Sequence, residues 1–251
     1  MEYTSDSYIQ RTAPLLLVIR PHTERLQALL NAKLITEADL KTNWKEELDN
    51  LPLKGIPWLY HFSPKCNLTS ILTHGLMSRA YASASGITIS QYGGNQISHD
   101  QSDSFGYTDF IHLCFCQDHP MMFRVAQETK QNLVLFAIDP IVIAFKGTQL
   151  TDQNAASNAH QTISSLGSMP SEVIEATKQR YVSRSSGIFG YHQAEVMVKQ
   201  YIPPFLIADY MEVKYFATPV SISSVPSAVG DASAAGATST ETKQPEDADK
   251  S

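Results

Sequence analysis

The sequence predicts an α+β fold in which mixed central β-sheets are flanked by helices and followed by a disordered C-terminal tail. Three observations support this fold class: apolar runs of strand length, amphipathic segments of helix length between them, and a final stretch poor in large apolar side chains. With 251 residues and 43% hydrophobic content, the chain is long enough to bury a complete core. We therefore expect one folded domain that ends in a tail.

The first 55 residues are expected to form an N-terminal helical extension. Apolar residues recur at helical spacing in residues 23–34 and 36–48, each behind a threonine suited to cap a helix. The preceding run Leu15–Ile19 fits either a strand or the start of a helix. Prolines and glycine then break the chain before the main domain, residues 56–218.

Within the main domain, apolar runs between polar residues predict strands, and amphipathic runs predict helices. The expected strands cover residues 58–62, 111–116, 132–139, 195–198 and 210–216. The expected helices cover residues 66–74, ended by Gly75, and 120–127, whereas residues 141–145 fit a helix or a strand. Residues 80–109 and 157–191 are polar intervals of a length that is usually functional or disordered.

Residues 219–251 consist mainly of Ala, Ser, Gly, Thr and acidic residues. They hold too few large apolar groups to offset the entropy that ordering a chain costs, so we expect a disordered tail. From Asp231 onward this tail carries five acidic residues against two lysines, in a chain with a formal net charge of -6. The acidic balance argues against a strongly basic nucleic-acid binder, but it leaves room for a local basic groove on the folded part.

The three cysteines, Cys66, Cys114 and Cys116, are odd in number and lack a metal-type spacing, which indicates a reducing compartment without a disulfide framework. Cys114 and Cys116 are interpreted as neighbours on one face of a strand. The N-terminus lacks the layout of a signal peptide, and no run approaches the ~18 apolar residues of a membrane span. These patterns favour a cytoplasmic protein without a membrane partner.

Two ionisable residues require a chemical explanation. His61 lies inside an otherwise apolar strand, and Glu195 stands at the head of another, where an unpaired buried charge is costly. Taken alone, His61 fits a core histidine bonded to a carbonyl group, and Glu195 fits a surface residue at a strand end. The sequence around them decides between these readings and a functional site.

The run Tyr60–Arg79 contains three short motifs in order, Tyr-His-Phe-Ser, Asn-Leu-Thr-Ser-Ile-Leu and Gly-Leu-Met-Ser-Arg. Four later segments follow: the strand 110–115 with Pro-Met-Met-Phe after it, the strand 133–139, the turn 154–157, and Gln-Ala-Glu-Val-Met-Val at 193–198 with Ile-Pro-Pro after it. In this order, over about residues 58–216, they resemble the DarT family of bacterial toxins. The resemblance implies an ADP-ribosyltransferase fold, NAD as co-substrate, ADP-ribose transfer to a nucleobase in single-stranded DNA, and a macrodomain-type antitoxin as partner.

The resemblance also assigns roles to individual residues. It maps the catalytic glutamate on Glu195, and it implies no metal. The residues assigned to NAD are His61, Ser63, Asn67, Gly75, Leu76, Arg79 and His99. Two of them have alternatives, because Ser63 also suits a cap of the turn before Pro64 and Asn67 a cap of the next helix.

The chemistry of the implied reaction suits a single acid on a rigid strand. Cleavage of the bond between nicotinamide and ribose develops positive charge on the anomeric carbon, in an oxocarbenium-like state that a nearby carboxylate stabilises. Glu195 can also accept a proton from the attacking base nitrogen, a contribution of about 10²–10⁴-fold.

The interval 157–191 leads to Glu195, and the resemblance implies that it touches the acceptor. Its Lys178, Arg180 and Arg184 are therefore expected to contact nucleic-acid phosphates. The alternative is a solvated basic face on a helix at 171–184, with Glu172 and Glu175 as ion-pair partners. Aromatic residues able to stack on bases lie in both polar intervals: Tyr81, Tyr92, Phe105, Tyr107, Tyr181, Phe189 and Tyr191.

One feature departs from the family pattern. The family carries an arginine before the second strand that grips the NAD phosphates, whereas no arginine or lysine lies between Arg79 and Arg124. Either Arg79 reaches the phosphates, or His99 takes part of the task, or the activity is altered.

Three functions are alternatives to the transfer of ADP-ribose to a DNA base. They are modification of RNA bases, a non-catalytic module that binds NAD or nucleic acid, and a protein-modifying transferase. Gln193 argues against the last of these, because arginine-directed relatives carry an acid at this position.

Overall fold

A computed structural model describes residues 21–91 and 104–213, all of which belong to one compact unit within residues 1–216. The predictions for Leu15–Ile19, Tyr92, His99 and the tail 219–251 concern residues outside this description. The boundaries expected for the N-terminal extension and the tail stay predictions.

A seven-stranded sheet of order β6-β5-β7-β3-β1-β4-β9 forms the centre of the unit. Its strands are β1 (Leu59–Pro64), β3 (Phe110–Cys114), β4 (Leu133–Ile138), β5 (Gln149–Thr151), β6 (Thr162–Ile163), β7 (Glu195–Lys199) and β9 (Ile207–Val213). A second, two-stranded sheet pairs β2 (Leu76–Met77) with β8 (Tyr201–Ile202). The pairings among these described strands are all antiparallel, whereas the sequence led us to expect mixed sheets.

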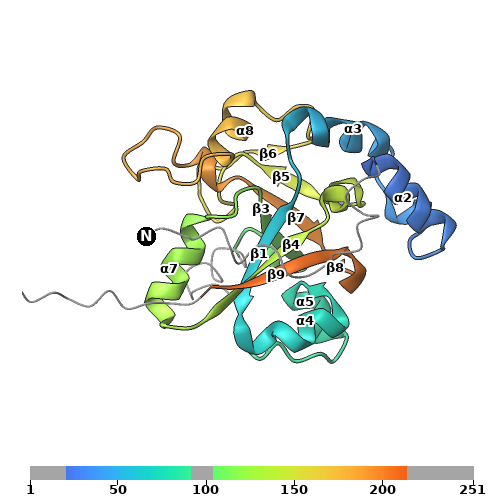
Figure 1. Cartoon of the computed structure of the whole chain (residues 1–251), viewed down its shortest axis with the longest axis horizontal. Helices are drawn as coiled ribbons and strands as arrows, with labels where there is room; N and C mark the ends of the chain where they lie inside the picture. The colour runs from blue at the N-terminus through green and yellow to red at the C-terminus, as the bar shows by residue number, and fades with distance from the viewer. Residues whose placement is uncertain (1–20, 92–103, 214–251) are drawn as a thin grey trace, which may run out of the picture. The chain divides into compact units, whose positions relative to one another are not determined.

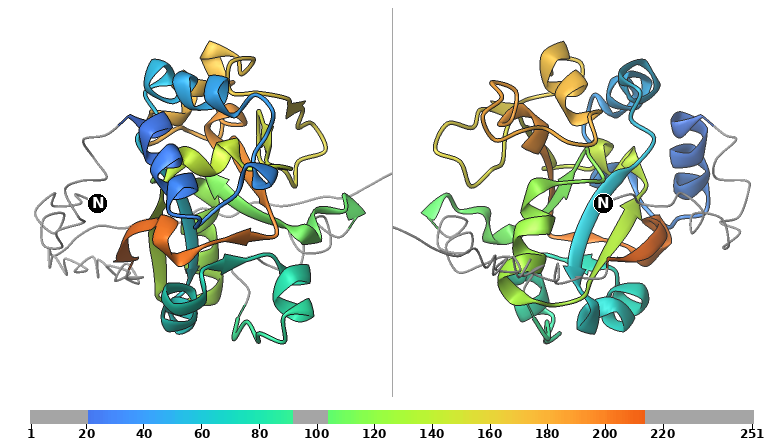
Figure 2. Two further views of the ribbon diagram at one scale, coloured as in Figure 1. Left: turned by 90° about the vertical axis from the view of Figure 1, so that its right-hand side faces the viewer. Right: turned by 60° about the vertical axis from the view of Figure 1, so that its left-hand side comes forward.

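Helices cover the sheet at both ends. The α-helices are α2 (His22–Asn31), α3 (Trp44–Lys54), α4 (Leu68–His74), α5 (Arg79–Ala84), α7 (Pro120–Thr129) and α8 (Ser171–Thr177). The 3₁₀ helices are η2 (Glu37–Asp39), η3 (Lys65–Asn67), η4 (Tyr107–Asp109), η5 (Pro140–Ala144), η6 (Tyr191–Gln193) and η7 (Pro204–Leu206). Figures 1 and 2 show α3 and α8 at one end of the sheet and α4 and α5 at the other. Among the described helices, none combines the length and the apolar character needed to cross a bilayer.

The second N-terminal helix lies later in the chain than its apolar spacing predicts. Thr36 and Asp39 form a capping box at the short helix η2, in which the backbone N–H and the hydroxyl of Thr36 donate to the Asp39 carboxylate, and α3 begins only at Trp44. The helix then passes through Pro52, which we expected to break it, and ends at Gly55 in the left-handed conformation. Residues 141–145, which fitted a helix or a strand, lie mainly in a helix, the buried 3₁₀ helix η5, which Pro140 starts.

The N-terminal helices share their core with the sheet. Leu26 of α2 and Leu48 of α3 are fully buried in the same hydrophobic cluster as Phe136 of β4. Buried polar contacts reinforce this packing: Arg25 pairs with Asp139. Similarly, the carboxylate of Glu47 on α3 accepts hydrogen bonds from Lys41 Nζ at 2.8 Å and from the backbone N–H of Leu166 at 2.7 Å. Removing either helix would therefore expose the core that supports β1 and β4.

Candidate active site

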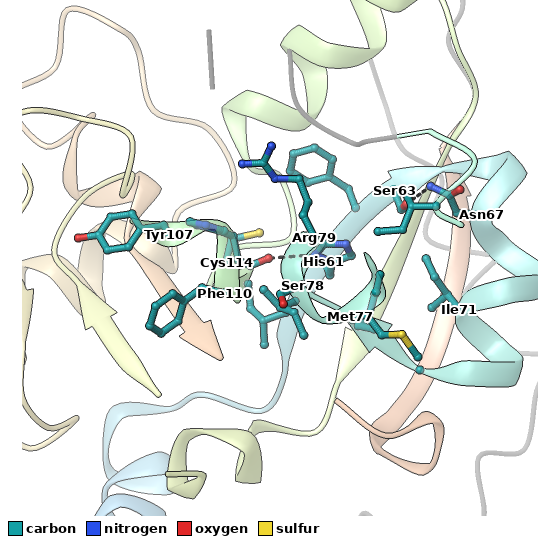
Figure 3. A pocket seen from close by; sticks show the side chains of 18 of the residues that line it. His61, Ser63, Asn67, Ile71, Met77, Ser78, Arg79, Tyr107, Phe110 and Cys114 are labelled. Atoms are coloured by element: carbon teal, nitrogen blue, oxygen red, sulfur yellow. Dashed lines mark hydrogen bonds between the residues drawn. The ribbon is translucent and has the colours of Figure 1, made fainter. Parts of the chain in front are cut away.

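A pocket of about 240 Å³ lies between β1, β3 and the segment from α4 to α5, and it reaches the first residue of β7. Figure 3 shows Tyr107 and Phe110 toward one end of it and Ser63 and Asn67 toward the other, with His61 between them. The predicted site residues that line this pocket are Glu195, His61, Ser63, Asn67, Gly75, Leu76 and Arg79. The fold therefore brings together residues that lie more than 130 positions apart in the sequence.

Glu195 is held at the start of β7 by partners from two neighbouring strands and a turn. Its Oε2 accepts hydrogen bonds from Nδ1 of His112 on β3 at 2.9 Å and from the backbone N–H of Ala155 at 3.1 Å. Its Oε1 accepts one from Nδ2 of Asn154 at 3.2 Å, and its own N–H donates to the hydroxyl of Thr151 on β5 at 3.3 Å. With 7% of its surface exposed, Glu195 is buried, and the reading as a surface residue at a strand end is wrong.

The turn Asn154–Ser157 places two of these donors. The side-chain oxygen of Asn154 accepts from the N–H of Ala156 at 2.9 Å, and its carbonyl oxygen accepts from the N–H of Ser157 at 2.8 Å. Such an Asx turn fixes the backbone tightly. As a result, the Asn154 amide and the Ala155 N–H both point at Glu195.

The carboxyl group of Glu195 is ionised at neutral pH. Burial alone would raise its pKa, but the neighbouring His112 and His119 and the N–H of Ala155 outweigh burial and hold the pKa below its usual range. The group is therefore a buried carboxylate with fixed hydrogen-bond donors, which is the form that stabilises positive charge.

His112 is a functional candidate that the sequence reasoning missed. It stands inside an apolar strand, which is the same signal that singled out His61. The register of the sheet pairs Cys114 with Glu195 and His112 with Met197, so the His112 ring lies beside the carboxylate. The position of a histidine within an apolar strand would therefore have identified both His61 and His112 as candidate site residues.

His61 has the hydrogen bond of a structural histidine and also lines the pocket. Its Nδ1 donates to the carbonyl oxygen of His112 at 2.9 Å, as a structural histidine would, yet its ring lines the pocket. Burial lowers the pKa of His61, with only partial compensation from the hydrogen bond to the carbonyl. The ring is therefore neutral at pH 7, with Nε2 as a hydrogen-bond acceptor.

Ser63 and Asn67 belong to a small hydrogen-bonded group at the far end of the pocket. The Asn67 amide donates to the Ser63 hydroxyl at 3.0 Å and to the carbonyl oxygen of Gln91, whose N–H returns a bond of 3.3 Å to Asn67. Asn67 precedes α4 but makes no capping hydrogen bond, so that alternative is wrong. The Asn67 side chain instead connects the start of α4 to Gln91 through hydrogen bonds.

Gly75 and Leu76 have a structural reason for their identity. Gly75 has a φ of +85°, and an added Cβ would collide with the carbonyl oxygen of Ile202. Leu76 is 3% exposed and belongs to the main core. Gly75 therefore allows the close approach of α4 to β8, and both residues shape the wall of the pocket.

Arg79 is the arginine of the described pocket lining, which includes no lysine. It stands at the start of α5, where the hydroxyl of Ser78 accepts the N–H of Tyr81 and caps the helix. Its side chain is half-buried and extends from α5 past His61 in Figure 3. Of the two substitutes for the family arginine that we considered, Arg79 lies at the pocket and His99 lies outside the described residues.

The three basic residues assigned to nucleic acid lie away from this pocket. Lys178 pairs with Glu175 at 2.6 Å, Arg180 pairs with Asp118 at 3.2 Å, and Arg184 is exposed. Lys178 and Arg180 line a separate hollow next to Gly55. The helix considered as the alternative is shorter than expected, because α8 ends at Thr177.

Some aromatic residues of the two polar intervals lie at the pocket, and others lie away from it. Tyr107 lines the pocket, and Phe105 stacks on it, whereas Tyr81 stacks on Tyr201. Tyr191 packs against the main core, and Phe189 is half-buried. Tyr181 is 82% exposed and lines neither of these hollows. In the described ranges, no group of three or more His, Cys, Asp or Glu side chains could hold a metal ion.

The chain is similar to two solved structures of DarT proteins. DarT of Thermus sp. 2.9 in complex with ADP-ribosylated ssDNA is 15% identical, with a TM-score of 0.50 over 61% of this chain and 79% of that one. DarTG of Thermosipho africanus in complex with ADP-ribose is 22% identical, with a TM-score of 0.49 over 60% of this chain. The chain spans 42% of the length of that Thermosipho protein. No curated protein matches the chain.

The family relationship is stronger than any of these pairwise likenesses. Residues 60–215, more than half of the chain, match the family described as "ssDNA thymidine ADP-ribosyltransferase, DarT". The matched region contains the sheet, the pocket and the strand that carries Glu195. The chain therefore belongs to the DarT family of single-stranded-DNA thymidine ADP-ribosyltransferases.

Proposed function

We propose that this chain transfers the ADP-ribose group of NAD⁺ to thymidine in single-stranded DNA. The observation that carries the proposal is the buried, ionised carboxylate of Glu195 at the end of a pocket with both polar and apolar walls. A non-catalytic binding module has no need to hold a charged group against burial with three hydrogen-bond donors. The family match and the Thermus complex with ADP-ribosylated ssDNA support the same reading.

The described pocket suits NAD⁺ as co-substrate. Arg79 supplies a cation for phosphate, the Ser63 hydroxyl and the neutral ring of His61 supply hydrogen-bonding groups, and Leu76 and Ile87 supply apolar surface. NAD⁺ contributes the ADP-ribosyl group and nicotinamide as the leaving group. Because residues 80–123 contain no arginine or lysine, we assign the contact with the NAD⁺ phosphates to Arg79.

Glu195 has two tasks in the proposed reaction. The carboxylate stabilises the positive charge that develops on the ribose carbon while the bond to nicotinamide breaks with its electron pair going to nicotinamide. It then accepts the proton of the thymine N–H as the new bond from that nitrogen to the ribose carbon forms. His112 donates to the same carboxylate and has a side chain that is 31% exposed, so it holds Glu195 in position and connects it to the pocket.

The proposed activity also defines partners and a compartment. A toxin that consumes NAD⁺ and modifies DNA requires an antagonist, and we assign this role to a macrodomain-type antitoxin that binds or removes ADP-ribose. The reaction places the protein in the cytoplasm, where DNA and NAD⁺ are both present. Co-expression with such a macrodomain is expected to restore growth to cells that produce the chain.

Incubation with NAD⁺ labelled in the adenylate phosphate tests the proposal. The chain is expected to label a thymine-containing single-stranded oligonucleotide, and Glu195→Gln is expected not to. Separate pools of RNA and protein decide the acceptor class: label in RNA alone would replace DNA by RNA. Binding of NAD⁺ without label in any pool would leave a non-catalytic module.

A further inference from the structure

Five aromatic rings form a continuous cluster at the end of the pocket that lies away from Ser63 and Asn67. The rings of Phe105 and Tyr107 stack with centroids 5.8 Å apart, and His160 meets the edge of Phe105 at 5.4 Å. Tyr107 also contacts Phe110 and His112 at 5.9 Å and 6.3 Å. These separations are those of attractive aromatic pairs.

The cluster has no role in the hydrophobic core. Neither of the two core clusters includes Phe105, Tyr107 or Phe110. Phe105 is 38% exposed, and Tyr107 and Phe110 are half-buried. Aromatic surface that is gathered at a pocket but not used for the core is typical of a binding site.

The cluster is held by the same turn that holds the catalytic carboxylate. The first residues of this turn, Asn154 and Ala155, donate to Glu195. Three residues after this turn, Nε2 of His160 lies 2.9 Å from the Tyr107 hydroxyl, and Nδ1 of His160 donates to the carbonyl oxygen of Ser157, the last residue of the turn. Tyr107 is therefore a ring of fixed orientation, and a single residue, His112, contacts both Tyr107 and Glu195.

We propose that Tyr107, braced by His160 and extended toward solvent by Phe105, is the platform on which the thymine to be modified stacks. This inference rests on the proposed function, because it needs a planar acceptor base near Glu195. A base stacked there presents its N–H edge to the carboxylate. The residues assigned to NAD, His61 and Ser63, lie farther along the pocket and leave this end for the acceptor.

A stacking platform is tested by removing the flat face from each partner in turn. The substrates are an oligonucleotide with one thymine and the same strand with 5,6-dihydrothymine, which keeps the N–H edge but is not planar. Stacking on an aromatic side chain is expected to make KM for thymine about 5- to 150-fold lower than for dihydrothymine in the unmodified chain. In Tyr107→Leu the KM for thymine is expected to rise by a similar factor and the preference to disappear.

Two further measurements separate stacking from damage to the fold. Tyr107→Phe keeps the ring but loses the hydroxyl that bonds His160, so its KM for thymine is expected to lie between those of the unmodified chain and Tyr107→Leu. Phe205→Leu is the matched control, because Phe205 is 40% exposed on η7 and lines neither hollow. Calorimetry with NAD⁺ is expected to give unchanged affinity for all three variants.

Each outcome has one meaning. A KM for thymine that is unchanged in Tyr107→Leu, or a loss of NAD⁺ affinity that matches the change in KM, overturns the platform and leaves the proposed function standing. An unmodified chain that labels neither oligonucleotide overturns the proposed function and the platform with it.

Discussion

Glu195 and the basic residues Lys178 and Arg180 are charged groups that the same fold treats in opposite ways. Glu195 is 7% exposed and receives three hydrogen bonds from groups on β3 and the 154–157 turn. The Arg180 side chain is 74% exposed, and both basic residues pair with nearby surface acids. A buried charge persists only where the fold holds it, whereas exposed pairs contribute little and rearrange easily. Glu195 therefore acts through its fixed position, whereas Lys178 and Arg180 act, at most, through their summed positive charge.

The largest effect is expected at the buried end of this comparison. Glu195→Gln keeps the shape and an acceptor oxygen but removes the charge, so we expect transfer to fall by at least about 10³-fold, the combined order of electrostatic stabilisation and general-base catalysis. The variant is expected to keep its fold at neutral pH, with a melting temperature somewhat below that of the unmodified chain. Labelling with NAD⁺ measures the loss, and Glu172→Gln, at an exposed acid of α8, is the matched control. Activity equal to the unmodified chain would remove Glu195 from the mechanism.

The next largest effect is expected when the support of the carboxylate is removed. In His112→Ala, burial of Glu195 is less well compensated, so the pKa of the carboxyl group rises and a larger fraction is protonated at acidic pH. The acid limb of the pH profile of kcat/KM is expected to move to higher pH, with a loss of about 10- to 150-fold for the missing bond to a charged group. His112→Gln, which keeps a donor, is expected to restore part of the rate. An unmoved acid limb would contradict this role.

The same pKa shift has a consequence for stability. Because the folded pKa of Glu195 lies below its unfolded value of about 4.3, its contribution is complete above that pH and is lost as the pH falls through the folded value. The melting temperatures of the unmodified chain and Glu195→Gln are thus expected to converge only in acid.

A smaller effect is expected at His61, which serves the fold and the pocket together. His61→Ala loses the bond to the His112 carbonyl and the ring that faces the ligand, so NAD⁺ affinity is expected to fall about 5- to 30-fold, equivalent to one or two hydrogen bonds. Calorimetry measures this. An unchanged affinity with a strongly lowered melting temperature would assign His61 to the fold alone.

The smallest effect is expected at the exposed end of the comparison. Replacing Lys178, Arg180 and Arg184 by Ala is expected to weaken binding of single strands modestly and to flatten its salt dependence by roughly 0.7 per lost phosphate contact in the log–log slope. Labelling of free thymidine, which has no phosphate, is expected to change much less. Binding titrations at two salt concentrations check the slope, and an unaltered slope leaves these residues as surface ion pairs.

The sequence predicted the five longer strands, β1, β3, β4, β7 and β9, and two ionisable residues of the pocket, because these depend on local pattern. It did not predict the short strands β2, β5, β6 and β8. Trp58–Phe62 and Glu195–Val198 are short apolar runs with one ionisable residue each, and both lie in β1 and β7 within one or two residues. The roles of Asn154 and Ala155 could not be predicted, since they depend on the pairing of Thr151 with Glu195 across β5 and β7. Register across a sheet is a tertiary property that spacing along the chain does not contain.

The errors have similarly local causes. The apolar spacing of residues 36–48 suggested one helix, but the reciprocal bonds between Thr36 and Asp39 favour a separate 3₁₀ turn. Asn67 was suited to cap α4 by its identity alone, yet Ser63 and Gln91 offered its amide better partners. In both cases a polar side chain had several possible hydrogen-bond partners, and the periodicity of the sequence does not indicate which of them it bonds.

The three cysteines give the protein a ready-made reporter. Burial raises the pKa of Cys114 and, with nearby Asp118 contributing, raises the pKa of Cys116 to about 12, so neither thiol forms the reactive thiolate at neutral pH. Cys66 is exposed and adjoins Asn67 at the far end of the pocket. A maleimide dye added to the natural sequence should therefore attach at one position and sense the arrival of the dinucleotide optically, without any engineered cysteine.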